Sequence, residues 1–161
     1  MNKFRYLSLL ICVSMILFLS AGCNRNPEKP SEISLKDLID LSDANISNIK
    51  TSEGGGIQTT IENPKQIQTI CSFLSKIVLK NEYQNEKDQQ DASGGLGAYF
   101  LITYANHESS HIEIKTDVHQ IKLRGQTQEG AIENGARVYS LSDSSQITDL
   151  DDVLSLTSSS D

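Results

Sequence analysis

The chain has 161 residues, and its 21 Asp and Glu residues outnumber its 14 Lys and Arg residues, which gives a formal net charge of −7. Proteins that bind nucleic acid neutralise backbone phosphates with clustered Lys and Arg, so this balance excludes nucleic acid as an expected partner. Anionic lipid headgroups would repel the same surface, so any membrane contact must come from another feature of the chain.

The first 22 residues have the pattern of an export signal. Lys3 and Arg5 give a positively charged start, residues 7–19 form a nearly unbroken apolar run, and three small residues follow. The apolar and small residues together number 16, whereas a helix that crosses a bilayer needs about 20. We therefore predict a signal peptide at residues 1–22. Its removal leaves 14 − 2 = 12 basic residues against 21 acidic ones, a formal charge of −9.

The end of this signal, FLSAGC, resembles the lipobox of bacterial lipoproteins, with Ser20 where the commonest form has Leu. The resemblance implies that a diacylglyceryl group is attached to Cys23 and that cleavage makes this residue the N-terminus of the mature protein. Two acyl chains are sufficient for stable anchoring. The expected location is thus the extracytoplasmic face of the cell membrane, held by the lipid. The alternative is an ordinary secretory signal, cleaved without lipidation.

The mature chain is expected to be a tether followed by one domain. Residues 23–33 contain two of the three prolines and one large apolar residue, which predicts a flexible tether. Residues 34–157 are long enough for a single core, and residues 158–161 form a frayed tail. If Cys12 leaves with the signal and Cys23 carries lipid, Cys71 is the one remaining thiol, and no disulfide can form.

The first half of the domain predicts one turn or two of helix after Ser34, then a hairpin around the glycines at 54–56, and then a long amphipathic helix. Asn63 and Pro64 form a strong helix start, because Asn caps free N–H groups and Pro lacks an N–H. Apolar residues then recur at helical spacing as far as Val78. Cys71 lies within that stripe, which predicts a buried, inert thiol.

The second half predicts strands. Residues 82–97 are polar and glycine-rich and are expected to form a long connection. Strand patterns follow in AYFLITYA, HIEIKT, QIKLR and RVYSL, with a polar loop at 125–135 before the last of them and a short helix after Thr148. The predicted fold class is α+β, with one long amphipathic helix packed on an antiparallel sheet of five or six strands. This layout resembles small lipoproteins of Gram-positive bacteria, and the resemblance implies no known activity.

Residues 107–111 read HESSH, which has the form H-E-x-x-H of zinc metallopeptidases. That chemistry needs a helix, in which residues four apart lie on one face and both reach the metal. The flanking residues alternate like strands, so we predict a hairpin turn in which His107 and His111 face each other across two strands, with Cβ atoms about 5 Å apart. The alternatives are weak metal binding by this pair and a peptidase with His107 and His111 as zinc ligands and Glu108 as the base.

Other candidate sites are less specific. Asp149, Asp151 and Asp152 lack the glycine and the distal glutamate of a calcium loop, and suit the start of a helix. His119 is expected to be an ordinary surface or partly buried histidine. We therefore expect no cofactor, no catalytic residues and no metal, and predict a non-enzymatic module that binds a protein, a wall component or a small solute. The metallopeptidase and a solute- or metal-binding accessory lipoprotein remain the alternatives.

Overall fold

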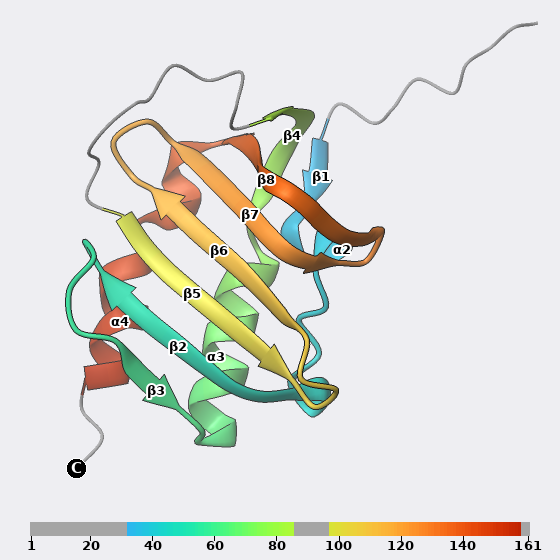
Figure 1. Ribbon diagram of the computed structural model, residues 1–161. Coiled ribbons are helices and arrows are strands. Elements are labelled where there is room, and N and C mark those ends of the chain that lie inside the picture. Colours follow the sequence, from blue (N-terminus) through green and yellow to red (C-terminus); the bar gives the residue numbers. More distant parts are fainter. Residues whose placement is uncertain (1–31, 86–96, 159–161) are drawn as a thin grey trace, which may run out of the picture.

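An eight-stranded antiparallel sheet forms the centre of the protein (Figure 1). The structure is a computed structural model that describes residues 32–85 and 97–158. The strand order is β1-β4-β8-β7-β6-β5-β2-β3. The strands are β1 (Glu32–Ser34), β2 (Ile46–Glu53), β3 (Thr59–Ile61), β4 (Val78–Asn85), β5 (Gly97–Tyr104), β6 (Ser109–Lys115), β7 (Gln120–Thr127) and β8 (Gly130–Leu141). The helices are α2 (Leu35–Leu38), α3 (Pro64–Ser75) and α4 (Leu150–Ser158), with 3₁₀ turns η1 (Asp43–Asn45) and η3 (Ser144–Ile147).

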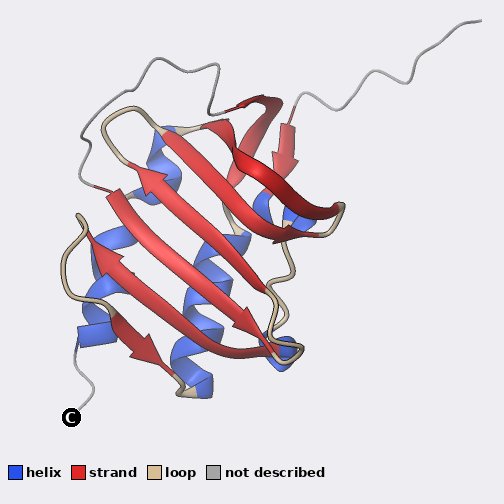
Figure 2. Cartoon of the chain, viewed as in Figure 1, coloured by secondary structure: helices blue, strands red, loops and turns tan. Residues whose placement is uncertain are grey.

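The core lies between one face of this sheet and the helices, which all lie behind the sheet in Figure 2. Side chains alternate between the two faces of a strand, and the buried positions of β5, β6 and β7 follow that alternation. The register puts Phe100 opposite Ile112, and Ile112 opposite Leu123. All three are at most 1% exposed, so a single apolar band crosses the three central strands. The opposite face carries half-buried polar and aromatic side chains.

Helix α3 begins where the sequence predicts and ends earlier. The side chain of Asn63 accepts a hydrogen bond of 3.0 Å from the backbone N–H of Lys65, and Pro64 is the first helical residue. The expected apolar stripe is buried from Ile67 to Leu74. The continuation to Val78 was wrong, because that residue starts β4 and pairs with β1. The helix therefore has twelve residues.

The α+β class agrees with the observed sheet and short helices, but the expected five or six strands and one long helix were wrong. The sequence pattern missed β1 and β4, and the predicted loop at 125–135 is instead the hairpin of β7 and β8. These segments have few apolar side chains, yet neighbouring strands satisfy their backbone groups, as in the pairs Thr127↔Gly130 and Gly125↔Ile132. Residues 32–33 of the expected tether belong to β1, and α4 reaches Ser158 in the expected tail.

Several expectations fall on residues outside the described part of the chain. These are the signal peptide at 1–22, Cys23, the tether as far as residue 31, residues 86–96 of the expected connection, and 159–161 of the tail. Within residues 32–85 and 97–158, no helix has the length and apolar character needed to cross a membrane. The expected hairpin near the glycines is formed by β2 and β3, but β3 starts at Thr59, and Ile57 lies before it and is 93% exposed.

Gly125 is required where β7 bends beside β6. Its φ is +78°, and an added Cβ would lie 2.3 Å from the backbone oxygen of Ser109. We expect Gly125→Ala to lower the free energy of unfolding by about 2–3 kcal/mol, because it adds both a left-handed strain and a clash with backbone. Urea denaturation of the purified protein measures this loss.

Gly55→Ala is the matched control for that measurement. Gly55 has nearly the same φ, +76°, but no atom lies within 4 Å of its added Cβ. Gly55→Ala should lower the free energy of unfolding by only about 1 kcal/mol, because it adds the left-handed strain without a clash. Equal losses in the two variants would contradict the assignment of a steric role to Gly125.

Candidate functional site

HESSH forms the end of a hairpin. Strand β5 ends at Tyr104, residues 105–108 turn, and β6 begins at Ser109. The backbone N–H of Tyr104 donates to the oxygen of Glu108 at 3.0 Å, and that of His107 donates to the oxygen of Tyr104 at 2.9 Å. His107 has a φ of 68°, in the left-handed region that such turns use. The predicted turn is confirmed, and the helix that a zinc peptidase needs is not formed here.

The predicted arrangement of the two histidines was wrong. His111 lies within β6 and pairs with Leu101 of β5, whereas His107 lies in the turn itself. The turn lies earlier in the chain than the prediction placed it, at residues 105–108, so the cross-strand partner of His111 is a strand residue. In the described part of the chain, no three His, Cys, Asp or Glu side chains are grouped so as to hold a metal ion.

His111 instead belongs to a polar cluster on the face of the sheet opposite the core. Its Nδ1 lies 2.7 Å from the Tyr99 hydroxyl, and its Nε2 lies 3.5 Å from the Ser109 hydroxyl. The ring meets that of Tyr99 edge to face, with centroids 5.9 Å apart. Partial burial, and then the nearby positive charge of Arg124, lower the pKa of His111. The neutral imidazole is therefore favoured, held in one orientation by Tyr99.

The pKa of His111 can be tested by NMR titration of the ring protons. Because its folded-state pKa is lowered, the imidazole should stay neutral to a lower pH than an ordinary histidine. Arg124→Gln removes one cause of the shift and should move the pKa of His111 upward, towards 6.5. Lys50→Gln removes a positive charge that is not a cause of the lowered pKa of His111, and should leave the titration of His111 unchanged. A midpoint above the ordinary value in the unmodified protein would contradict the arrangement.

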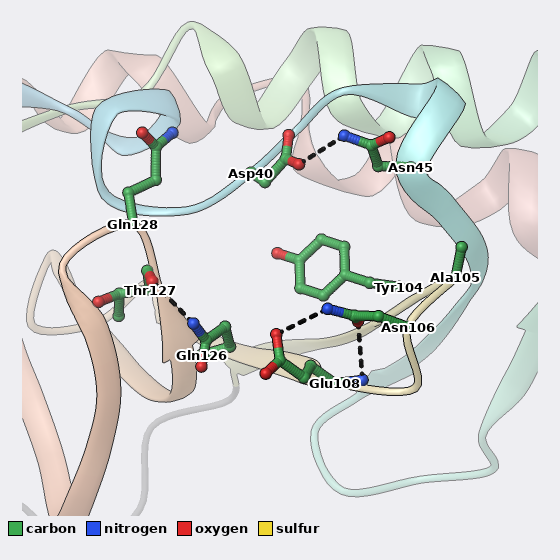
Figure 3. Close-up of a pocket in the computed structure, with 9 residues that line it drawn as sticks. All are labelled: Asp40, Asn45, Tyr104, Ala105, Asn106, Glu108, Gln126, Thr127 and Gln128. Carbon is green, nitrogen blue, oxygen red and sulfur yellow. Dashed lines mark hydrogen bonds between the residues drawn. The ribbon is translucent and has the colours of Figure 1, made fainter.

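A hollow of about 400 Å³ opens beside the HESSH turn, and we name it the end pocket (Figure 3). This volume lies within the range of small-molecule sites. Three segments distant in sequence form it, and backbone hydrogen bonds join them: Ala105 N–H donates to the oxygen of Asn45 at 2.9 Å, and Gln128 N–H to that of Leu38 at 2.8 Å. Its lining residues are Asp40, Asn45, Tyr104, Ala105, Asn106, Glu108, Gln126, Thr127 and Gln128.

Tyr104 is buried within the end pocket and is fixed by a short relay of hydroxyl groups. Its hydroxyl lies 2.7 Å from that of Ser110, which donates in turn to the backbone oxygen of Gln126 at 2.6 Å. The Ser110 hydroxyl has one proton, already given to Gln126, so Tyr104 must be the donor to Ser110. Burial raises the pKa of Tyr104, more than the bond to Ser110 lowers it, so the phenol keeps its proton. The relay ties β5 to β6 and β7.

Two carboxylates lie on opposite sides of the end pocket, with the Tyr104 ring between them (Figure 3). Asp40 accepts from the Ser42 N–H at 2.9 Å and from Nδ2 of Asn45 at 2.8 Å. Glu108 accepts from Nδ2 of Asn106 at 2.9 Å. None of the nine lining residues is Lys, Arg or His. The end pocket is therefore polar and acidic.

Of these residues, Glu108 is the one that a sequence motif indicates, as the base of the alternative peptidase interpretation of HESSH. The segment around Asp40 had no motif, and it precedes HESSH by more than sixty residues. Polar residues in a predicted turn indicated exposure, but nothing in the pattern indicated that three turns meet. The close approach of Asp40 and Gln126 to the HESSH turn depends on strand order.

Cys71 has the environment that the sequence predicted. It is a residue of α3 and is 5% exposed within the core cluster. Burial, together with the negative charges of Asp43 and Asp40, raises its pKa to about 12. The thiol is thus protonated at neutral pH and unreactive as a nucleophile.

Comparison with known proteins adds no relative to these observations. No protein-family model, no curated protein and no solved structure matches the chain. The fold and the end pocket define a sheet-rich α+β domain with a polar hollow at one end. A fold of this kind does not by itself specify a function, which depends on the side chains of the site.

Proposed function

We propose that this protein is an extracytoplasmic lipoprotein, anchored through a lipid on Cys23, that binds a small polar solute in the end pocket without catalysing a reaction. The observation that carries the binding proposal is the composition of that pocket: eight of its nine lining residues have polar side chains, drawn from three separate segments. A concave site with convergent polar groups is the usual setting for a small ligand. A soluble fragment of the cell wall is one source of such a solute.

Binding is favoured over catalysis because the hydroxyl groups of the end pocket already donate hydrogen bonds to other groups of the protein. Thr127 donates to the backbone oxygen of Gly130 at 2.6 Å, and Tyr104 donates to Ser110. Neither hydroxyl has a His, Lys or Cys partner among the nine lining residues, so none is activated as a nucleophile. The neutral imidazole of His111 lies on the open face of the sheet and is not one of the lining residues.

The anchor would hold the domain close to the membrane. Eight residues, 24–31, separate Cys23 from the start of β1 at Glu32. A fully extended chain spans at most about 3.3–3.6 Å per residue, so the domain would lie within roughly 30 Å of the lipid. Such a tether keeps a bound solute near the cell surface.

Lipidation is tested in cells that process lipoproteins and are supplied with labelled palmitate. We expect the label on the unmodified protein and its loss in Cys23→Ala, because the diacylglyceryl group is bonded to that thiol. Cys71→Ala removes a different cysteine and should keep the label. Label on Cys23→Ala, or a mature chain that retains residues 1–22, would contradict anchoring at Cys23.

Solute binding is tested by thermal unfolding with a panel of sugars, amino sugars, amino acids and soluble wall fragments. A true ligand at 100 times its Kd stabilises the folded state by about 2.7 kcal/mol and so raises Tm. Ala105→Trp puts an indole at the edge of the end pocket and should abolish that increase.

Ile57→Trp is the matched control, because Ile57 is 93% exposed and borders a different hollow, beside α4. It should leave the ligand-induced increase in Tm intact. A panel in which no solute gives an increase sensitive to Ala105→Trp would contradict binding in the end pocket.

A further inference from the structure

The amide side chains of the end pocket are oriented by their protein partners. Nδ2 of Asn45 faces the Asp40 carboxylate, and Nδ2 of Asn106 faces that of Glu108. A carboxylate only accepts, so the nitrogen of each amide must be the atom turned to it. Asn106 is fixed a second time, because its Oδ1 accepts from the Glu108 N–H at 3.0 Å.

The two glutamines of the end pocket follow the same rule. Nε2 of Gln126 donates to the backbone oxygen of Thr127 at 3.3 Å. Nε2 of Gln128 lies 2.8 Å from the backbone oxygen of Lys36 and 3.3 Å from that of Ile39. All four amide nitrogens are thus directed to acceptors within the protein, which leaves fewer donors for a ligand.

The two carboxylates retain the capacity to accept. A carboxylate offers about four lone-pair sites, of which Asp40 uses two and Glu108 uses one in the bonds described. An anionic ligand would meet these two negative groups with no cation among the lining residues to offset them. A ligand with a positive charge and several N–H or O–H donors complements both the charge and the hydrogen-bonding groups.

A bare metal ion fits this geometry less well than an organic cation. Calcium takes six to eight oxygen ligands at about 2.3–2.6 Å, and the carboxylates that would have to converge on it stand on opposite sides of the hollow (Figure 3). No group of three potential metal ligands is found among residues 32–85 and 97–158. A primary ammonium group has three donors and can be held by one carboxylate while hydroxyl groups of the same ligand reach the other.

We propose that the end pocket recognises its ligand through a primary ammonium group, and that amino sugars are the class that fits: a cationic amine on a small polyhydroxylated ring. This inference rests on the proposed function, since it names the ligand class of the same site. Asp40 and Glu108 are the residues that select the charge, and Tyr104 forms the wall between them.

Three probes that share one sugar ring separate charge from shape. Glucosamine carries an ammonium group, glucose is neutral, and glucuronate is an anion. Isothermal titration of the full-length protein in detergent micelles at about pH 6.5 keeps the amine protonated. Glucosamine should bind at least about tenfold more tightly than glucose, because a charged hydrogen bond replaces a neutral one, and glucuronate should give no heat of binding. The glucosamine affinity should fall with added salt.

Variants assign the effect to the two carboxylates. Asp40→Asn and Glu108→Gln remove a charge and keep the shape, and together they should reduce glucosamine affinity by about tenfold, to that of glucose. Asp117→Asn is the control, because it removes an exposed carboxylate from the turn between β6 and β7, at the other end of β6 from the pocket. Circular dichroism of each variant checks that the sheet is retained.

The outcomes separate this inference from the proposed function. If glucose or glucuronate binds as tightly as glucosamine and Ala105→Trp abolishes that binding, the amine proposal is overturned and the end pocket remains a solute site. If glucosamine gives no heat of binding, or if the double carboxylate variant binds it as tightly as the unmodified protein, the amine proposal is overturned regardless of what other solutes do. Calcium that displaces glucosamine in a one-to-one ratio would also overturn it, in favour of a metal site.

Discussion

The apolar band that runs from Phe100 through Ile112 to Leu123 is the constraint on which the rest of the structure depends. A slip of one residue in either pairing would turn a row of large apolar side chains out of the core, so burial on one face sets the register. Once the register is set, the ends of β5, β6, β7 and β8 are also set. The turn after β5 and the turn after β7 then lie at the same end of the sheet.

The end pocket is a consequence of that alignment. The two turns supply most of its lining, and the segment from Leu38 to Asn45 completes it. The backbone oxygen of Asn45 accepts from the Ala105 N–H, and that of Leu38 accepts from the Gln128 N–H. The relay from Tyr104 through Ser110 to Gln126 joins the same strands from within. The polar lining is therefore held by the same pairing that buries the core, which is a suitable basis for a pre-formed binding site.

HESSH illustrates how one short sequence is divided among different environments. Glu108 faces the end pocket, Ser110 is buried in the relay, and His111 stands on the opposite face of the sheet beside Tyr99. In a helix, the first and last residues of this motif would share one face and could share a metal. In a turn that continues into a strand they separate, so the motif loses its usual chemistry while one of its residues takes part in a different site.

Local patterns were sufficient to predict the start of α3, the burial of Cys71, the central strands and the hairpin turn at HESSH. Asn63 and Pro64 start α3 through the backbone of the adjacent residues, and the alternation along β5 to β7 is a property of each strand. Both features can therefore be read from residues that are neighbours in sequence. The patterns that predict an export signal and a lipid site at Cys23 are likewise local. Only the tertiary structure decided that the polar segments of β1, β4 and the β7–β8 hairpin are strands, because their partners lie far away in sequence. It also decided that Asp40 and Glu108 line one hollow, since strand order, not any motif, brings their two turns together.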